Sequence, residues 1–161
     1  MIVVADTSVF LNLCRVGHEE LLRLLFSQVV APAVVQQEFI RAISAYPRFQ
    51  GLVFPSWVQI NDPAQPLAAI SPMALLDLGE SDAISLAHEL KADAVLLDES
   101  RGRLVAKSLN LRTFGVLGIL AMAKKASLIP LAMPVLQDLR LKAGFWVSKS
   151  AEEELRRACG E

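Results

Sequence analysis

Two acidic residues stand directly after apolar runs that are typical of buried strands. Asp6 follows residues 2–5 (IVVA), and Asp98 follows residues 94–97 (AVLL). Short runs rich in branched aliphatic residues predict strands that are covered on both faces. Because ligands of open α/β sheets bind beyond the carboxyl ends of the strands, we expect both carboxylates at one rim of the sheet.

Three further acidic residues are predicted near the same rim, on helices. Glu38 lies about six residues into a helix expected after Pro32, and helical side chains lean toward the helix N-terminus. Glu80 and Asp82 stand at the start of another predicted helix, where the helix dipole favours negative charge. The sequence therefore predicts a group of carboxylates contributed by separate parts of the chain.

Such a group is the kind of site that binds divalent cations. At a separation of about 4 Å, two ionised carboxylates repel one another by about 4 kcal/mol at an effective dielectric constant near 20. A cation removes this repulsion, and ligands that are all oxygen suit Mg²⁺ or Mn²⁺. Cys14 and Cys159 lie near opposite ends of the chain and lack the spacing of a zinc site. Because Mg²⁺ takes substrate phosphates as further ligands, the pattern indicates phosphodiester chemistry.

Each of these carboxylates also has a structural interpretation. Asp6 and Asp98 can instead cap the helices that follow them. Glu38 can be a solvated helix residue, and Glu80 and Asp82 can be ordinary acids of a first helical turn. The shared position at corresponding ends of separate units favours the metal site over these alternatives.

Apolar runs and helical periodicities alternate along most of the chain. The predicted strands are residues 2–5, 28–31, 57–60, 94–97 and 112–116. The first predicted helix begins at a cap at Thr7 or Ser8 and ends at about Arg15, and the last begins at a capping box formed by Ser150 and Glu153. Between them, helices are predicted over about 18–26, after Pro32, and over about 72–77, 81–91, 101–109, 117–126 and 133–143. Gly79 separates the helix over 72–77 from the helix over 81–91. This alternation predicts an α/β fold in which helices cover both faces of a parallel sheet.

The composition is typical of one soluble domain. The 161 residues are enough to bury a core, and the formal charge of −1 gives no global positive field for a nucleic acid. The apolar runs are far shorter than the roughly 20 residues of a membrane span, and the N-terminus lacks the pattern of a signal peptide. We therefore expect a cytoplasmic protein that does not enter a membrane.

The acidic motifs, taken in order, resemble those of the PIN-domain family. VVADTS at 3–8 is similar to the first strand and Asp-Thr-Ser motif of that family, and APAVVQQEF at 31–39 to its second strand and acidic helix. LGESDAISLA at 78–87 and ADAVLLDES at 92–100 resemble its third and fourth acidic motifs. The resemblance covers roughly residues 1–130 and implies a three-layer α/β/α sandwich with a central parallel sheet. Residues 131–161 are then expected to form a helical extension that packs on the same domain.

The resemblance also implies which residues form the site. The implied metal ligands are Asp6, Glu38, Asp82 and Asp98, with Glu80 as an additional or alternative third ligand; Thr7, Ser8 and Glu99 would support them. Many family members carry another Asp beyond the Asp98 position, where this chain has Ser100, Arg101 and Gly102. This departure weakens the case for two metal ions.

The implied function is a Mg²⁺- or Mn²⁺-dependent endoribonuclease. The later motifs resemble a prokaryotic, VapC-like toxin branch, which implies the toxin of a type II toxin–antitoxin pair, a cognate antitoxin partner and a homodimer. One alternative is a catalytically inactive PIN-like module that binds a partner. Another is a receiver-type phosphoryl-transfer domain, which the lack of an acidic neighbour beside Asp6 disfavours.

Basic and aromatic residues provide candidate RNA contacts. Arg101 and Arg103 surround the Asp98 region and can contact phosphates, as can Lys107 and Arg112 nearby, although a solvated helix face explains them equally well. Trp57 and Trp146 can stack on bases, but packing in the core or at an interface is the preferred prediction for both.

Overall fold

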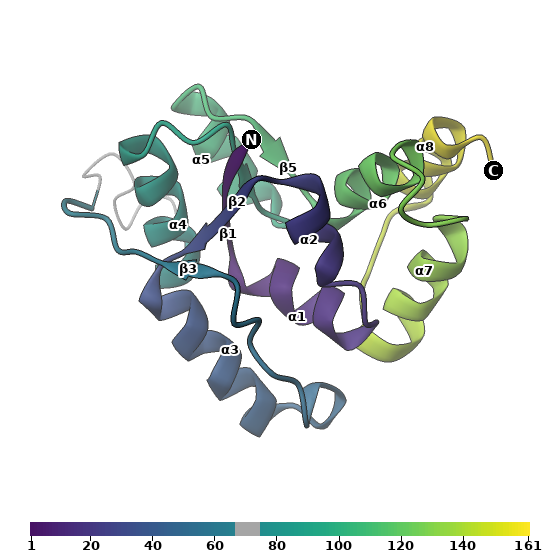
Figure 1. The fold of residues 1–161 in the computed structure, drawn as a ribbon, viewed down its shortest axis with the longest axis horizontal. Coiled ribbons are helices and arrows are strands. Elements are labelled where there is room, and N and C mark those ends of the chain that lie inside the picture. Colours follow the sequence, from purple (N-terminus) through teal and green to yellow (C-terminus); the bar gives the residue numbers. More distant parts are fainter. Residues whose placement is uncertain (67–74) are drawn as a thin grey trace.

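A computed structural model describes residues 1–66 and 75–161 of the chain. At its centre is a five-stranded sheet in which every neighbouring pair is parallel, in the order β3-β2-β1-β4-β5 (Figure 1). The strands are β1 (Ile2–Ala5), β2 (Gln28–Ala31), β3 (Gln59–Ile60), β4 (Ala94–Leu96) and β5 (Thr113–Phe114). The strand predictions are confirmed, with shorter ends than expected at β3 and β5.

Helices follow or connect these strands. They are α1 (Thr7–Arg15), α2 (Glu20–Leu25), α3 (Ala33–Ala45), the 3₁₀ turn η1 (Pro47–Phe49), α4 (Leu78–Glu89), α5 (Ser100–Ser108), α6 (Val116–Lys125), α7 (Met133–Asp138), the π-helical turn η4 (Leu139–Ala143) and α8 (Lys149–Cys159). No helix within the described residues is both long and apolar enough to cross a membrane.

Side chains of the sheet alternate between two apolar cores, as the period of two in a strand requires. One core contains Val3, Ala5, Val29, Ala31, Ala94 and Leu96 with side chains of α1, α2, α3 and α6; the other contains Val4, Val30, Val95 and Leu97 with side chains of α4 and α5. Figure 1 shows α4 and α5 on one side of the sheet and α1, α2 and α6 on the other. The predicted three-layer α/β/α sandwich is confirmed.

The strand order changes direction beside β1. The chain runs from β1 outward to β2 and β3, and then returns to place β4 and β5 on the other side of β1. The Asp6 amide donates to the Leu96 carbonyl at 3.1 Å, which joins the ends of β1 and β4. Ligand sites of open α/β sheets lie at such a switch point, beyond the carboxyl ends of the strands.

The helix that carries Glu80 begins earlier than predicted. Asp77 caps α4: its Oδ1 accepts from the Glu80 amide at 2.8 Å, and Glu80 reaches back to the Asp77 amide. Gly79 therefore lies inside the first turn, and the expectation that it separates two helices was wrong. The helix predicted over 72–77 lies partly outside the described residues, and residues 75–77 are not helical.

Two other predicted caps differ from the structure. Asp6 occupies the N-cap position of α1, and Thr7 is already helical, so neither Thr7 nor Ser8 is the cap residue. At α8 the cap is Ser148, whose Oγ accepts from the Ala151 amide at 3.1 Å; the expected cap at Ser150 was wrong by two residues. The reason is that Ser148 has the extended backbone of a cap, whereas Ser150 is already helical.

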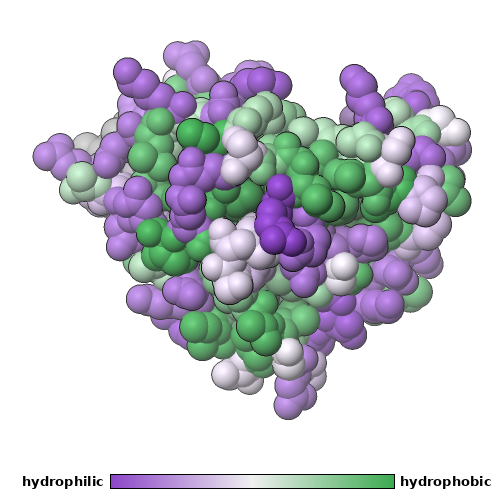
Figure 2. Space-filling model, viewed as in Figure 1, coloured by the Kyte–Doolittle hydropathy of each residue, from purple (hydrophilic) through white to green (hydrophobic). Residues whose placement is uncertain are grey.

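The surface carries apolar and charged side chains side by side. Figure 2 shows apolar patches broken by hydrophilic side chains on the face seen there. Several large apolar side chains are well exposed in the structure, among them Leu24 at 60%, Val53 at 80% and Trp146 at 82%. The apolar excess of the sequence is therefore only partly used in the two cores.

Candidate metal centre

Asp6 is a buried carboxylate that the fold does not use as a helix cap. Its side chain makes no capping hydrogen bond to α1, and the residue is only 4% exposed. Its Oδ1 has no hydrogen-bond partner among the described residues. Burial raises the pKa of Asp6 well above its ordinary value, and nearby Asp77, Glu80 and Glu38 raise it further. The capping alternative does not explain this residue.

Glu38 connects three elements at the same rim. From α3, its Oε2 accepts from the Thr7 hydroxyl at 2.6 Å and its Oε1 accepts from the Gly79 amide at 3.1 Å. The second contact places the carboxylate at the N-terminus of α4, where the helix dipole stabilises negative charge. A Cβ atom on Gly79 would lie 2.2 Å from Glu38 Oε2, so only glycine allows this approach.

Asp77 completes a group of three carboxylates that the sequence did not predict. One oxygen each of Asp6, Glu38 and Asp77 lies within 4.8 Å of the others. Asp77 was missed because the helix was expected to begin after Gly79. The signal that could have found it is the sequence Asp-Leu-Gly-Glu at 77–80, which has the spacing of a capping box.

Glu80 is a buried carboxyl group near this group of three, and its pKa is raised. It is 2% exposed, and its Oε1 lacks a hydrogen-bond partner among the described residues. Burial, followed by the charges of Asp77 and Glu99, raises the pKa of Glu80 to about 7. A Cβ atom on Gly102 of α5 would lie 3.1 Å from Glu80 Oε1, so α5 closes over the carboxyl group.

The two carboxylate oxygens of Asp98 have different surroundings. Its Oδ1 accepts from the Val116 amide at 2.8 Å, so it binds the start of α6 and not of the helix that directly follows it. Its Oδ2 is buried without a partner in the described residues. Burial raises the pKa of Asp98, while the Val116 amide, the Arg103 charge and Asn12 oppose that rise. The alternative that Asp98 caps the helix directly after it was wrong, because Glu99 is the N-cap residue of α5 and Asp98 binds the start of α6 instead.

These carboxylates open into one cleft of about 760 Å³. Asp6, Glu38, Asp77, Asp98 and Glu99 contribute to its lining, together with Thr7, Ser8, Arg48 and Trp146. Four separate parts of the chain therefore supply acidic groups to a single hollow.

The group fits a divalent cation such as Mg²⁺ or Mn²⁺. Every candidate ligand atom is a carboxylate oxygen, which is the donor that these cations prefer. One oxygen of each of the three carboxylates lies within 4.8 Å of the others, and small side-chain movements would bring all three to the bond length of about 2.1 Å from one Mg²⁺ ion. The buried oxygens Asp6 Oδ1 and Asp98 Oδ2 lack other partners among the described residues and are free to coordinate.

Comparison with protein families agrees with this geometry. A family described as PIN domain matches residues 2–161, which is nearly the whole chain. This chain belongs to the PIN-domain family. No curated protein and no solved structure matches it. PIN domains are generally metal-dependent nucleases, and this chain has an acidic cluster that could bind a metal ion.

The remaining predicted residues do not belong to the group of three carboxylates. Asp82 is half-buried on α4 but does not belong to the group of three carboxylates in the described structure. Burial, and then the charge of Asp62, raises its pKa, so its acidic neighbour is a residue outside the cleft. The Ser8 hydroxyl is buried beside Asp6 without a partner among the described residues, and Arg101 and Arg103 line an adjoining hollow.

Proposed function

We propose that this PIN domain is an endoribonuclease that depends on Mg²⁺ or Mn²⁺. The observation that carries the proposal is the buried Asp6 carboxylate at the switch point of the sheet, with Glu38 and Asp77 within 4.8 Å of it. A protein does not gain stability from unpaired buried carboxylates, so a ligand is the best reason for this arrangement. The inactive binding module would have no need to keep the arrangement.

We assign the residues roles from their surroundings. Asp6 would be the central ligand, with Glu38, Glu80 and Asp98 from the predicted set and Asp77 in addition. Asp82 stays a predicted ligand, and it is the weakest of them because it does not line the cleft and its acidic neighbour is Asp62. A bound cation would supply an activated water and would neutralise charge on the phosphate.

The chain's own side chains would orient the carboxylate ligands and neutralise the charge of the phosphate. The Thr7 hydroxyl and the Gly79 amide fix the direction of the Glu38 carboxylate. In the metal-free protein Glu80 has a pKa of about 7, and a cation bound at this carboxylate would displace its proton. Arg103 lies beside Asp98 and can neutralise a phosphate that enters the cleft.

The test is cleavage of labelled single-stranded and structured RNAs with Mg²⁺, with Mn²⁺ and with EDTA. We expect cleavage that requires the cation and that is lost in Asp6→Asn and Asp98→Asn. Asp138→Asn is the matched control, because Asp138 lies in α7 and pairs only with Lys142 at 3.6 Å among the described residues. An unchanged rate in Asp6→Asn would reject the site, and no cleavage by any variant would favour the inactive module.

The finer proposal is that the nuclease is the toxin of a type II pair, that it acts in the cytoplasm, and that it forms a homodimer silenced by an antitoxin. It rests on the resemblance of the later sequence motifs. Induced expression in a bacterial host should stop growth with the wild type and not with Asp6→Asn. Growth that continues equally with both would reject the toxin role while leaving the nuclease proposal standing.

A further inference from the structure

Trp146 is an indole presented to solvent beside the acidic cleft. It is 82% exposed, while its neighbours Phe145 and Val147 pack against the larger apolar core. Alternate residues of an extended segment point in opposite directions, so the inward packing of these two neighbours turns Trp146 outward. Core or interface packing was the preferred prediction for Trp146; the exposed indole rules out core packing, and interface packing stays a prediction.

The segment that carries Trp146 is fixed at both ends. On one side Gly144 has a left-handed φ of +67°, and the Phe145 amide donates to the Leu139 carbonyl at 3.1 Å. On the other side Ser148 caps α8 through the Ala151 amide. The backbone that carries the indole is therefore held in place on both sides of Trp146.

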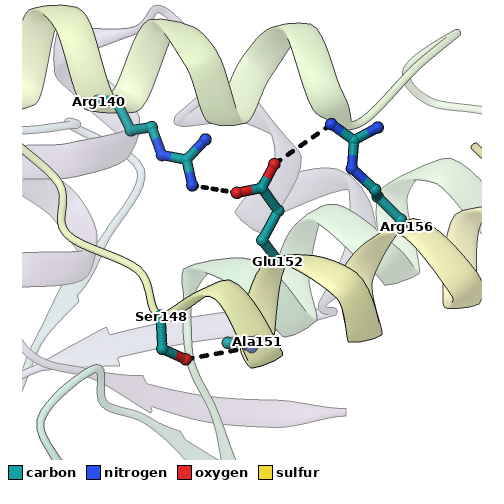
Figure 3. A network of polar contacts seen from close by, with 5 residues as sticks. All are labelled: Arg140, Ser148, Ala151, Glu152 and Arg156. Carbon is teal, nitrogen blue, oxygen red and sulfur yellow. Dashed lines mark hydrogen bonds and ion pairs between the residues drawn. The ribbon is translucent and has the colours of Figure 1, made fainter.

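A charged network ties the two flanking helical segments together. Figure 3 shows Glu152 of α8 between Arg140 of η4 and Arg156 of α8. Arg140 donates to Glu152 Oε2, and Arg156 donates to Glu152 Oε1 at 3.2 Å. This network holds the helical segments on either side of residues 144–148 and so maintains the position of Trp146.

Trp146 stands where two hollows meet. It lines both the acidic cleft and a second hollow of about 630 Å³, and Asp98, Glu99 and Phe145 are also common to both. The second hollow adds Arg101 and Arg103 to the lining. A ligand that leaves the acidic cleft over Trp146 therefore meets guanidinium groups next.

A third groove continues the path along α5. It measures about 540 Å³ and shares Ser100 and Arg103 with the second hollow. Its lining includes Lys107 and Arg112 and contains no acidic residue. The path therefore begins at acidic side chains, which suit a metal ion, and ends at basic side chains, which suit the phosphates of a nucleic acid.

We propose that Trp146 is a stacking platform for one unpaired base of the RNA, and that the strand then runs over Arg103 toward Lys107 and Arg112. This inference rests on the proposed nuclease function, and it names a base site and a strand direction for it. Proteins that bind single-stranded nucleic acids commonly combine an exposed aromatic ring with basic side chains beside it, and Trp146 with Arg103 offers this combination. In a duplex only the terminal pairs present a free base face, so the site favours unpaired nucleotides.

The test uses binding in EDTA, where metal-dependent cleavage is absent. The probe is a fluorescein-labelled single-stranded 12-nucleotide RNA of mixed sequence, compared with its duplex. Trp146→Ala should weaken the affinity for the single strand by about 5- to 100-fold, and Trp146→Phe should restore most of it because a ring remains. Lys107→Ala and Arg112→Ala should each weaken binding and reduce its dependence on salt.

A second readout follows the indole itself. The chain has two tryptophans, so in Trp57→Phe the remaining fluorescence comes from Trp146. We expect the single-stranded RNA to quench this fluorescence and the duplex to leave it largely unchanged. Equal affinity of wild type and Trp146→Ala, without quenching in Trp57→Phe, would overturn the inference, as would a change of oligomeric state in Trp146→Ala with unchanged RNA affinity.

The two proposals fail in different ways. If the protein cleaves RNA and Trp146→Ala binds and cleaves like the wild type, the nuclease proposal stands and the base platform is rejected. If RNA binding depends on Trp146 but no metal-dependent cleavage occurs, the platform stands and the nuclease proposal is rejected.

Discussion

Glu152 on the outer surface of α8 and Asp6 at the base of the cleft carry the same chemical group in opposite surroundings. Glu152 accepts hydrogen bonds from Arg140 and Arg156, and the bond from Arg140 is the main reason that its pKa is lowered. Asp6 has three acidic neighbours and an oxygen without a partner among the described residues, and burial raises its pKa.

The difference separates a structural carboxylate from one kept for a ligand. Buried polar groups in folded proteins nearly always have partners, and exceptions need an explanation. Glu152 has both of its oxygens paired within the protein, whereas Asp6 Oδ1 and Asp98 Oδ2 are buried without a partner among the described residues and would gain one when a cation binds. Functional sites commonly break the rules that the rest of the molecule obeys.

The largest expected effect comes from neutralising the cleft. Asp6→Asn should reduce cleavage by at least about 100-fold, because loss of residues that merely orient metal ligands already costs 10- to 100-fold. It should also raise the thermal midpoint of the metal-free protein, because a buried acid whose ionised form is repelled by Asp77, Glu80 and Glu38 is replaced by a neutral amide. Thermal unfolding with and without Mn²⁺ measures both the gain and the loss of the metal-induced shift. A variant that is destabilised yet still responds to Mn²⁺ would place the metal elsewhere.

A smaller loss should follow from crowding Glu38. Gly79→Ala places a Cβ atom 2.2 Å from Glu38 Oε2, so the carboxylate must move and Mn²⁺ affinity should fall about 10-fold or more. Gly118→Ala is the matched control, because its nearest neighbour would be Phe114 at 3.7 Å. Calorimetric titration with Mn²⁺ compares the two. Equal affinities would show that Glu38 is not a ligand.

The pH dependence should distinguish the cleft from the α8 surface. The pKa of Glu80 is ordinarily 4.5 and is raised to about 7 in the folded protein. Between these two pH values, the folded protein holds a proton on Glu80 that the unfolded chain has released. The free energy of unfolding in EDTA should therefore fall as the pH rises from 5 to about 7, and Asp6 acts in the same direction. Urea unfolding should show a flatter profile for Glu80→Gln. An identical slope in both proteins would remove Glu80 from the explanation.

The smallest effect is expected at the surface network. Glu152→Gln should lower the thermal midpoint by a few degrees at neutral pH, because the charge that binds Arg140 and Arg156 is lost. The lowered pKa of Glu152 means that its contribution is present above the ordinary value and disappears as the pH falls through the lowered one. The Mn²⁺-induced shift should stay at the wild-type value. A weaker metal response would connect the two regions that we describe as independent.

Most of the fold could be predicted from the sequence because its signals are local. The runs that became β1, β2 and β4 are apolar and buried on both faces, so their pattern alone identifies them. β3 has only two residues, Gln59 and Ile60, and both are exposed, so its extent depends on pairing with β2 and not on a pattern. The π-helical turn at Leu139–Ala143 likewise has no signal in the helical periodicity.

The site residues that follow strands could be predicted from the sequence, whereas the residue at the start of α4 was missed. Asp6 and Asp98 follow β1 and β4, and the neighbouring positions of those strands bring them to one cleft. The α4 boundary was misplaced because Gly79 was interpreted as a break, and this error hid Asp77 and emphasised Asp82. Gly79 serves a different purpose, since its missing side chain lets Glu38 approach α4.

The most direct test of the metal site is a crystal structure of the protein soaked in Mn²⁺, with data collected for anomalous scattering. We expect an anomalous peak in the cleft, within bonding distance of Asp6 and of at least one of Glu38, Asp77, Glu80 and Asp98. A cleft without a peak at saturating Mn²⁺, or a peak bound only by residues outside it, would contradict a metal-dependent nuclease site at Asp6.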